Sequence, residues 1–200
     1  MPVYTIYVDT GEDYSTAAKS LDGNFKKVYP AGFEFDPESS DPAAPENTIR
    51  QPDRSYVQKT FARQGLRVVP DHLPKTVQLE GPRRDPGDLL ISNSVPLVSQ
   101  RFQAMVEGLE PGRHQVAPVE LVWTDGSHAG SFCWFYPCAR VDSMDREKTT
   151  HDLHRGRYWK RTPGGVFVVS LARVGAHHVW IDPRVLAFDL PFVSAEVRGA

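Results

Sequence analysis

Four histidines are the side chains best suited to hold a metal ion. His151 and His154 stand three positions apart, and His177 and His178 are adjacent in a segment that we predict to be a strand. A zinc site needs about four ligands that converge on the ion, whereas adjacent residues of a strand point to opposite faces. The spacing therefore favours structural or surface histidines, and we predict no metal ligand. The alternative is a small metal-dependent hydrolase built around His151 and His154.

Carboxylates and thiols give two further candidates for chemistry. Asp142 and Asp145 could act as paired carboxylates, but basic residues such as Arg146 interleave with them, which favours local ion pairs. Cys133 and Cys138 have a spacing that matches neither the redox motif nor the common zinc motifs. We interpret both cysteines as reduced thiols packed in the core.

Serine chemistry finds no support in the sequence. A nucleophile elbow requires Gly-x-Ser-x-Gly after a strand, and residues 126–130 (GSHAG) hold these residue types in a different order. Ser99 and Ser194 each follow a proline-marked apolar segment and precede a run that suits a helix, so we interpret both as helix N-caps. The sequence therefore predicts no catalytic residue and no cofactor, and we interpret the chain as non-enzymatic.

The composition limits the classes of partner. The chain has 200 residues, of which 40% are hydrophobic, and a formal net charge of −2. A protein that binds nucleic acid usually carries a basic excess, so nucleic acid is not expected as a partner. No apolar run approaches the roughly 18 residues that span a bilayer, and the N-terminus lacks the pattern of a signal peptide. We expect no membrane contact and a cytoplasmic location.

Hydrophobic patterns predict an α+β fold with mostly antiparallel sheets, a few short helices and a proline-rich N-terminal loop region. The strand candidates are residues 4–8, 66–69, 76–79, 88–91, 119–124 and 132–136. The last of these is apolar on both faces, which is typical of a central strand. A second hairpin is predicted from residues 166–169 to residues 179–181. The best helix begins at Ser99, where apolar residues recur at helical spacing up to Leu109.

The proline-rich region, residues 22–54, holds most of the candidate partner contacts. Proline removes backbone donors and fixes φ, so long regular elements are not expected there. Its acidic side chains could attract a basic partner, and we select Glu34, Asp36, Glu38 and Asp41. Tyr158 and Trp159 complete the set, because basic neighbours predict partial exposure and these residue types are enriched in binding hot spots.

One ordered set of segments resembles a known family. The segments are residues 89–91, 98–102, 118–121, 135–137, 141–145, 178–181 and 192–194. Together they resemble an immunity-protein family of bacterial polymorphic toxin systems, first described as a domain of unknown function in myxobacterial and other proteobacterial genomes. The resemblance extends from Asp88 to Val197, so we divide the chain into an N-terminal lobe (1–87) and an immunity-like α+β region (88–200), and we expect the two to form one compact unit.

The resemblance implies a function without catalysis. It implies a cytoplasmic protein that binds a cognate toxin or effector protein and blocks the active site of that toxin. It carries over no catalytic residue, because the shared segments are strands and helix caps. A binding or scaffold domain with no toxin partner stays open as a further alternative.

Overall fold

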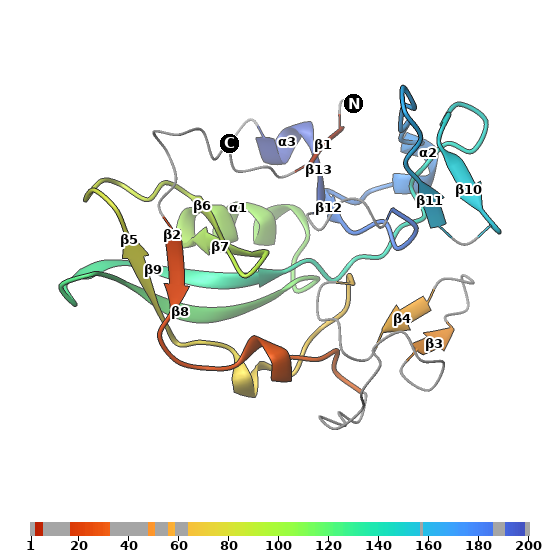
Figure 1. The fold of residues 1–200 in the computed structure, drawn as a ribbon. Helices are drawn as coiled ribbons and strands as arrows, with labels where there is room; N and C mark the ends of the chain where they lie inside the picture. The colour runs from red at the N-terminus through yellow and green to blue at the C-terminus, as the bar shows by residue number, and fades with distance from the viewer. Residues whose placement is uncertain are drawn as a thin grey trace.

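A computed structural model describes residues 3–5, 17–32, 48–50, 56–58, 64–156, 158–185 and 191–198. Strands dominate it, and the helices of the described residues are short (Figure 1). Among neighbouring strands of the described residues, only β5 and β8 run parallel. The predicted α+β class with mostly antiparallel sheets is confirmed.

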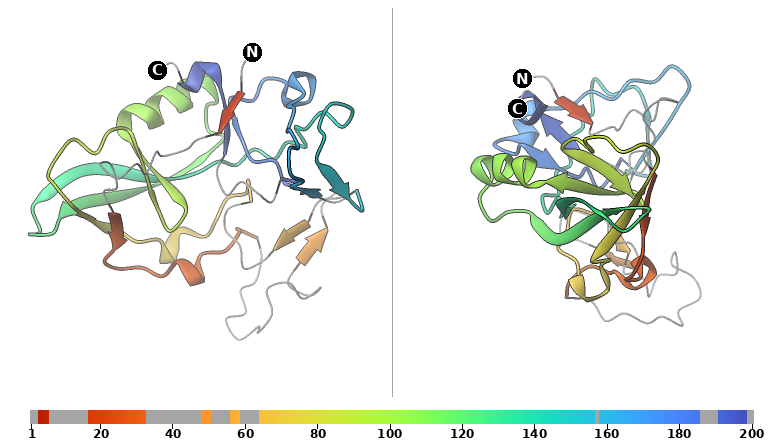
Figure 2. Two further views of the ribbon diagram at one scale, coloured as in Figure 1. Left: turned by 45° about the horizontal axis from the view of Figure 1, so that its top comes forward. Right: turned by 90° about the vertical axis from the view of Figure 1, so that its left-hand side faces the viewer.

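The largest sheet has six strands in the order β2-β5-β8-β9-β7-β6. In that order the strands are Ala17–Ser20, Thr76–Glu80, Gln115–Trp123, His128–Tyr136, Val95–Ser99 and Leu89–Ser92. The two edge strands meet at a hydrogen bond in which Ser92 Oγ donates to the carbonyl oxygen of Ala18 at 2.8 Å. The sheet therefore curls on itself (Figure 2), which covers part of both exposed edges.

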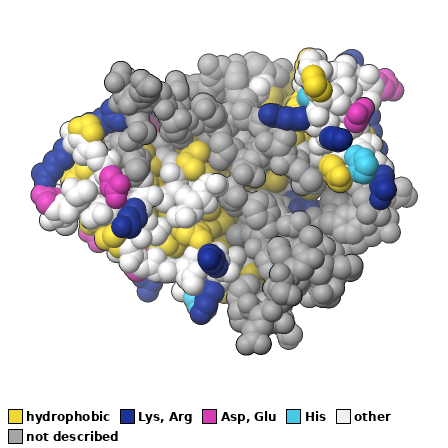
Figure 3. Space-filling view, in the orientation of Figure 1, with side chains coloured by type: hydrophobic (Ala, Val, Ile, Leu, Met, Phe, Trp, Pro, Cys, Tyr) yellow, Lys and Arg dark blue, Asp and Glu magenta, His cyan; other side chains and the backbone are white. Residues whose placement is uncertain are grey.

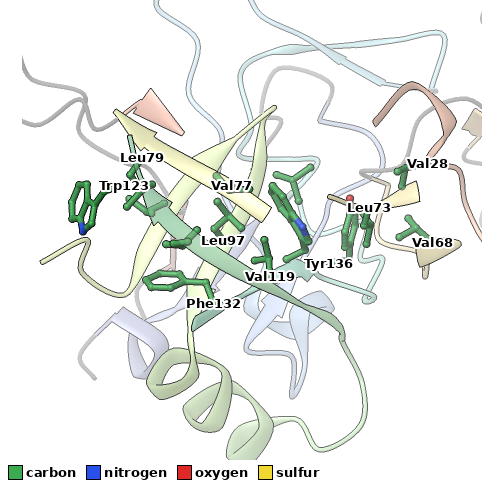
Figure 4. Close-up of a cluster of buried hydrophobic side chains, with 14 residues drawn as sticks. Val28, Val68, Leu73, Val77, Leu79, Leu97, Val119, Trp123, Phe132 and Tyr136 are labelled. Atoms are coloured by element: carbon green, nitrogen blue, oxygen red, sulfur yellow. The ribbon is translucent and has the colours of Figure 1, made fainter. Parts of the chain in front are cut away.

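The inside of this curl holds the largest hydrophobic cluster (Figure 4). Phe132, Trp134 and Tyr136 enter it from alternate positions of β9, as the two-residue period of a strand requires. Trp134 is fully buried, and its Nε1–H donates to the carbonyl oxygen of Pro74 at 2.7 Å. Since β9 lies between β8 and β7, the prediction of a central strand is confirmed.

Helix α1, Gln100–Leu109, covers the outer face of β7 and β9. Ser99 caps it, because Ser99 Oγ accepts the N–H of Phe102 at 3.2 Å. The apolar side of the helix packs on Cys133 and Phe135. The predicted helix and its cap are both confirmed.

The C-terminal third lies beside the large sheet (Figure 1) and has a separate hydrophobic cluster of its own. Its small sheet has the order β1-β13-β12, and a hairpin pairs β10 with β11. The strands are β1 Val3–Thr5, β10 Asp152–His154, β11 Tyr158–Lys160, β12 Val179–Trp180 and β13 Phe192–Ser194. The short helices are α2 Leu171–Val174 and α3 Ala195–Arg198, and α3 begins directly after Ser194, where we expected a helix.

The remaining elements are short. They are the 3₁₀ helices η1 Phe25–Lys27 and η3 Pro70–His72, and the paired strands β3 Thr48–Arg50 and β4 Tyr56–Gln58. Within the proline-rich region, only η1 and β3 are regular elements of the described residues. Among the described helices, none is both long and apolar enough to cross a membrane.

Two predictions of secondary structure are wrong. Residues 166–169 do not pair with residues 179–181, because α2 lies between them and β12 pairs with β13 instead. Residues 66–69 form no strand, and Val68 makes only an isolated bridge to Pro30. The side-chain amide of Gln115 bonds both the N–H and the carbonyl oxygen of Val68, at 2.7 and 2.9 Å. These two backbone groups of Val68 are therefore not available for hydrogen bonds to a neighbouring strand.

The division at residue 87 stays a prediction. Strands β2 and β5 precede this position, whereas β6, β7, β8 and β9 follow it, and all six belong to one sheet. The two predicted parts therefore share a hydrophobic cluster.

Candidate partner-binding surface

An open groove of about 610 Å³ lies beside β8 and β9. Its buried floor is apolar and includes Val119, Phe132 and Cys133. Its exposed rim combines apolar and polar side chains, which are Pro70, Lys75, Gln100, Pro118, Glu120, His128 and Ser131. An apolar floor with a polar rim is the usual arrangement of a protein-binding surface.

The groove follows an incompletely paired part of β8. Strand β5 pairs only with Glu120–Trp123, so the first half of β8 has no strand on that side among the described residues. The N–H of Glu120 donates to the carbonyl oxygen of Lys75 at 2.9 Å, which shows that Glu120 directs its N–H away from β9. Pro118 lies two residues earlier and has the same orientation. Because proline has no N–H, this edge lacks a donor where another strand would pair.

Two polar side chains of the rim contact one another. Glu120 Oε1 lies 3.3 Å from His128 Nδ1, and both side chains are 58% exposed. Cys133 is the only thiol that lines the groove; it is buried, and its Sγ–H donates to Gln103 Oε1 at 3.2 Å. Burial raises the pKa of the Cys133 thiol, so this side chain stays neutral and unreactive at neutral pH. The groove can therefore bind a partner but offers no activated nucleophile.

The structure describes only some of the residues predicted to contact a partner. Glu34, Asp36, Glu38 and Asp41 lie outside the described residues. Tyr158 is half-buried on β11.

The prediction that Trp159 is partly exposed is wrong, because only 4% of its surface is exposed. Trp159 pairs with Leu153 across the β10–β11 hairpin, and both side chains face the separate hydrophobic cluster of the C-terminal third. Strand alternation turned the tryptophan inward despite its charged neighbours.

His151 and His154, the histidines of the alternative metal site, have different surroundings. His151 is buried, where its Nδ1 accepts the N–H of Thr162 at 3.1 Å and its ring lies 4.1 Å from that of Phe167. His154 is exposed on β10. Among the described residues, no group of three or more histidine, cysteine, aspartate or glutamate side chains could hold a metal ion.

Glu110 is a structural centre that sequence reasoning missed. This buried residue follows α1, and its carboxylate lies 3.0 Å from His114 Nε2 and 3.3 Å from His177 Nδ1. It also accepts the N–H of Val179 at 2.8 Å. No local pattern signals this cluster, because His114 lies beyond the end of α1 and His177 is 67 positions away in sequence.

Glu110 is ionised despite its burial. Burial alone would raise its pKa, but the hydrogen bonds from His114, from the N–H of Val179 and from His177 outweigh burial and lower the pKa to about 2. The N–H of Cys138 donates to Nδ1 of His114 at 3.0 Å, so Nε2 carries the proton that points to Glu110. Glu110 thus connects the end of α1 to β12 and to the segment before β8.

The predicted ion pairs around Asp142 and Asp145 are confirmed. Arg146 Nη2 lies 2.7 Å from Asp142 Oδ2, and Lys148 Nζ lies 3.6 Å from Asp145 Oδ2. Neither carboxylate is free to act as a base beside the other, since each has cationic partners of its own.

Comparisons with known proteins identify one family. The model of an immunity protein family, Imm11, matches residues 21–200. This match begins earlier than the resemblance read from residues 88–197, and it includes the proline-rich region. The comparison with curated proteins found no match.

Proposed function

This chain belongs to the Imm11 immunity protein family, and we propose that it neutralises a bacterial toxin by binding it and covering its active site. The family match over residues 21–200 is the observation that carries the proposal. We further propose that the protein acts in the cytoplasm, without catalysis and without a cofactor.

The groove beside β8 is the proposed centre of the contact. A partner that covers its apolar floor would bind more tightly, since each Å² of apolar surface removed from water contributes about 25 cal/mol to the free energy of association. The rim side chains Lys75, Glu120 and His128 could exclude mismatched partners. Val116, which is 37% exposed on the same strand, extends the apolar surface beyond the groove.

Contacts outside the groove are needed as well. Inhibitory complexes bury about 1,200–2,000 Å² in total, more than one groove supplies. We propose Glu34, Asp36, Glu38, Asp41 and Tyr158 as additional contacts, and we leave Trp159 out because it is buried. Acidic side chains would speed association with a basic toxin, by about 10–1,000-fold at low salt.

Co-expression with the toxin encoded by the neighbouring gene tests the proposal. We expect the chain to restore growth of cells that produce this toxin and to co-purify with it. Restored growth without a complex would contradict neutralisation by binding. Growth arrest with or without this chain would contradict the immunity function.

Two variants test the contact surface. Ser131→Arg places a long charged side chain on the exposed rim of the groove, whereas Thr124→Arg places the same side chain at the exposed tip of the β8–β9 hairpin. We expect only Ser131→Arg to weaken toxin binding, by more than tenfold, with both variants folded by circular dichroism. Equal toxin binding by both variants would exclude the groove from the interface with the toxin.

The acidic contacts have a test of their own. Reversal of Glu34, Asp36 and Glu38 to lysine should slow association with the toxin and reduce its dependence on salt. An association rate that does not change would remove this segment from the interface.

A further inference from the structure

Three arginines surround one carboxylate in the C-terminal third of the molecule. Asp142 Oδ2 lies 2.7 Å from Arg146 Nη2, 3.0 Å from Arg184 Nε and 3.4 Å from Arg173 Nη1. One carboxylate balances only one guanidinium. A second acid beside the cluster is Asp182, whose oxygens accept hydrogen bonds from Ser143 and from the N–H of Arg184. Even with Asp182 ionised, the cluster keeps an excess of positive charge.

Two of these guanidinium groups face solvent. The side chains of Arg146 and Arg173 are each 42% exposed, whereas that of Arg184 is only 4% exposed. A guanidinium has five N–H donors, and among the described residues Asp142 is the acceptor for both exposed groups. Most of their donors therefore remain available to an incoming acceptor. Figure 3 shows lysine and arginine side chains on the same part of the molecule, over α2, β10 and β11.

The pair is held in place before any partner arrives. Asp142 restrains both exposed guanidinium groups, and Arg184 is fixed from the other side because its Nη1 donates to the carbonyl oxygen of Gly156 at 2.7 Å. The N–H of Trp159 donates to the carbonyl oxygen of Arg184 at 2.7 Å, which ties the cluster to β11. Restrained side chains lose less entropy on binding than free ones.

We propose that Arg146 and Arg173 bind a carboxylate, and that an aspartate or glutamate side chain of the toxin supplies it. The second half of this inference rests on the proposed function. Arginine pairs with carboxylates through two parallel hydrogen bonds, which gives direction as well as attraction. A site of this kind would fix the orientation of the toxin on the surface.

The charge pattern favours a protein carboxylate over nucleic acid. A phosphate backbone needs a continuous basic surface, but acidic side chains interrupt this one, including exposed Glu147 and exposed Asp152. The chain as a whole carries a net charge of −2.

A titration followed by NMR tests the site without the toxin. The probe is a hexaglutamate peptide, and the signals are the Nε–Hε resonances of Arg146 and Arg173. We expect saturable shifts of both resonances and no shift for Arg83. This exposed arginine is the control, because it pairs with a single acid, Asp125, and belongs to a segment distant in sequence from Arg146 and Arg173. Equal shifts of all three arginines, or none, would overturn the proposal. Tighter binding of inorganic phosphate or oligothymidine than of hexaglutamate would also overturn it.

Variants then connect the site to the toxin. Arg146→Gln combined with Arg173→Gln should weaken toxin binding about 10–100-fold, as expected for the loss of one or two charge-assisted hydrogen bonds. Arg83→Gln should have no effect. The double lysine variant, which keeps the charge and the pairing with Asp142, should recover only part of the affinity, because lysine cannot form the paired bonds.

The outcomes separate the two proposals. If the double glutamine variant folds and binds the toxin as the wild type does, the arginine pair is not a toxin contact, while the immunity function stands. If the wild type gives no protection but still binds hexaglutamate through these arginines, the immunity function fails and the carboxylate site stands.

Discussion

At the scale of single residues, the carboxylate of Glu110 should contribute strongly to stability. It is a buried anion that bonds two segments, His114 before β8 and, at the start of β12, His177 and the N–H of Val179, and it also pairs with Arg113 at 3.1 Å. Loss of the carboxylate would leave buried donors without an acceptor, and such groups are costly. No comparable penalty applies to the exposed carboxylates of the molecule.

We predict that Glu110→Gln lowers the free energy of unfolding by about 3 kcal/mol at pH 7. The pKa of Glu110 is about 2 in the folded protein and 4.5 ordinarily. The charge therefore stabilises the fold fully above pH 4.5, and this contribution is lost as pH falls toward 2. Urea unfolding at several pH values should show the difference between wild type and variant narrowing to about half near pH 3.

Comparison of the wild type with Glu110→Gln cancels the effect of a second buried acid, Asp182. Burial raises the pKa of Asp182, so this group affects stability with the opposite sign as pH falls. Both proteins contain Asp182, and its effect cancels in the difference. Glu80→Gln, at an exposed position, is the control. A difference between wild type and Glu110→Gln that is constant from pH 7 to 3 would mean that the charge of Glu110 does not stabilise the fold.

At the scale of elements, α1 depends on the serine that precedes it. The hydroxyl of Ser99 accepts the N–H of Phe102 and donates to Asp88 Oδ1. The same residue ends β7, so it fixes the point at which the chain leaves the sheet and begins the helix. The side chains that α1 lays on β9 follow from that starting point.

Ser99→Ala should lower the free energy of unfolding by about 1–2 kcal/mol, since an N-cap of this kind contributes about that much. For a chain of this length, the melting temperature should fall by roughly 2–4 °C for each kcal/mol. Differential scanning calorimetry measures the change. Ser99→Thr keeps the hydroxyl and should melt close to the wild type; an equal loss in both variants would point to packing at this position instead of the cap.

At the scale of the whole molecule, one curled sheet joins the two halves of the sequence. β2 and β5 supply an edge and a neighbour for β8, and Val77 and Leu79 of β5 are completely buried in the shared cluster. The family match from residue 21 onward agrees with this structural unity. The groove beside β8 also needs both halves, because its rim includes Pro70 and Lys75.

We predict that residues 88–200 do not fold when they are produced alone. Without β5, one side of β8 would be unpaired along its whole length, and the apolar face of β8 and β9 would be exposed to water. The amide resonances of this fragment should be poorly dispersed in an NMR spectrum, whereas those of the full chain should be well dispersed. A fragment with native-like dispersion would instead support a domain boundary at residue 87.

The sequence determined the local features of this protein. The periodicity after Ser99 was sufficient to predict α1, and the apolar run Phe132–Tyr136 was sufficient to predict a central strand. The alternation of charges near Asp142 predicted its ion pairs. Each of these features depends on residues within about one turn or one strand, where neighbours along the chain decide the conformation.

Tertiary structure decided the features that need distant partners. The direction of Trp159 depended on its pairing with Leu153, and residues 66–69 lost their strand to the side chain of Gln115. Glu110 gathers groups that are up to 69 positions away in sequence, and the groove joins four separate segments. Packing brings such groups together only when the chain is folded, so no local pattern can reveal them.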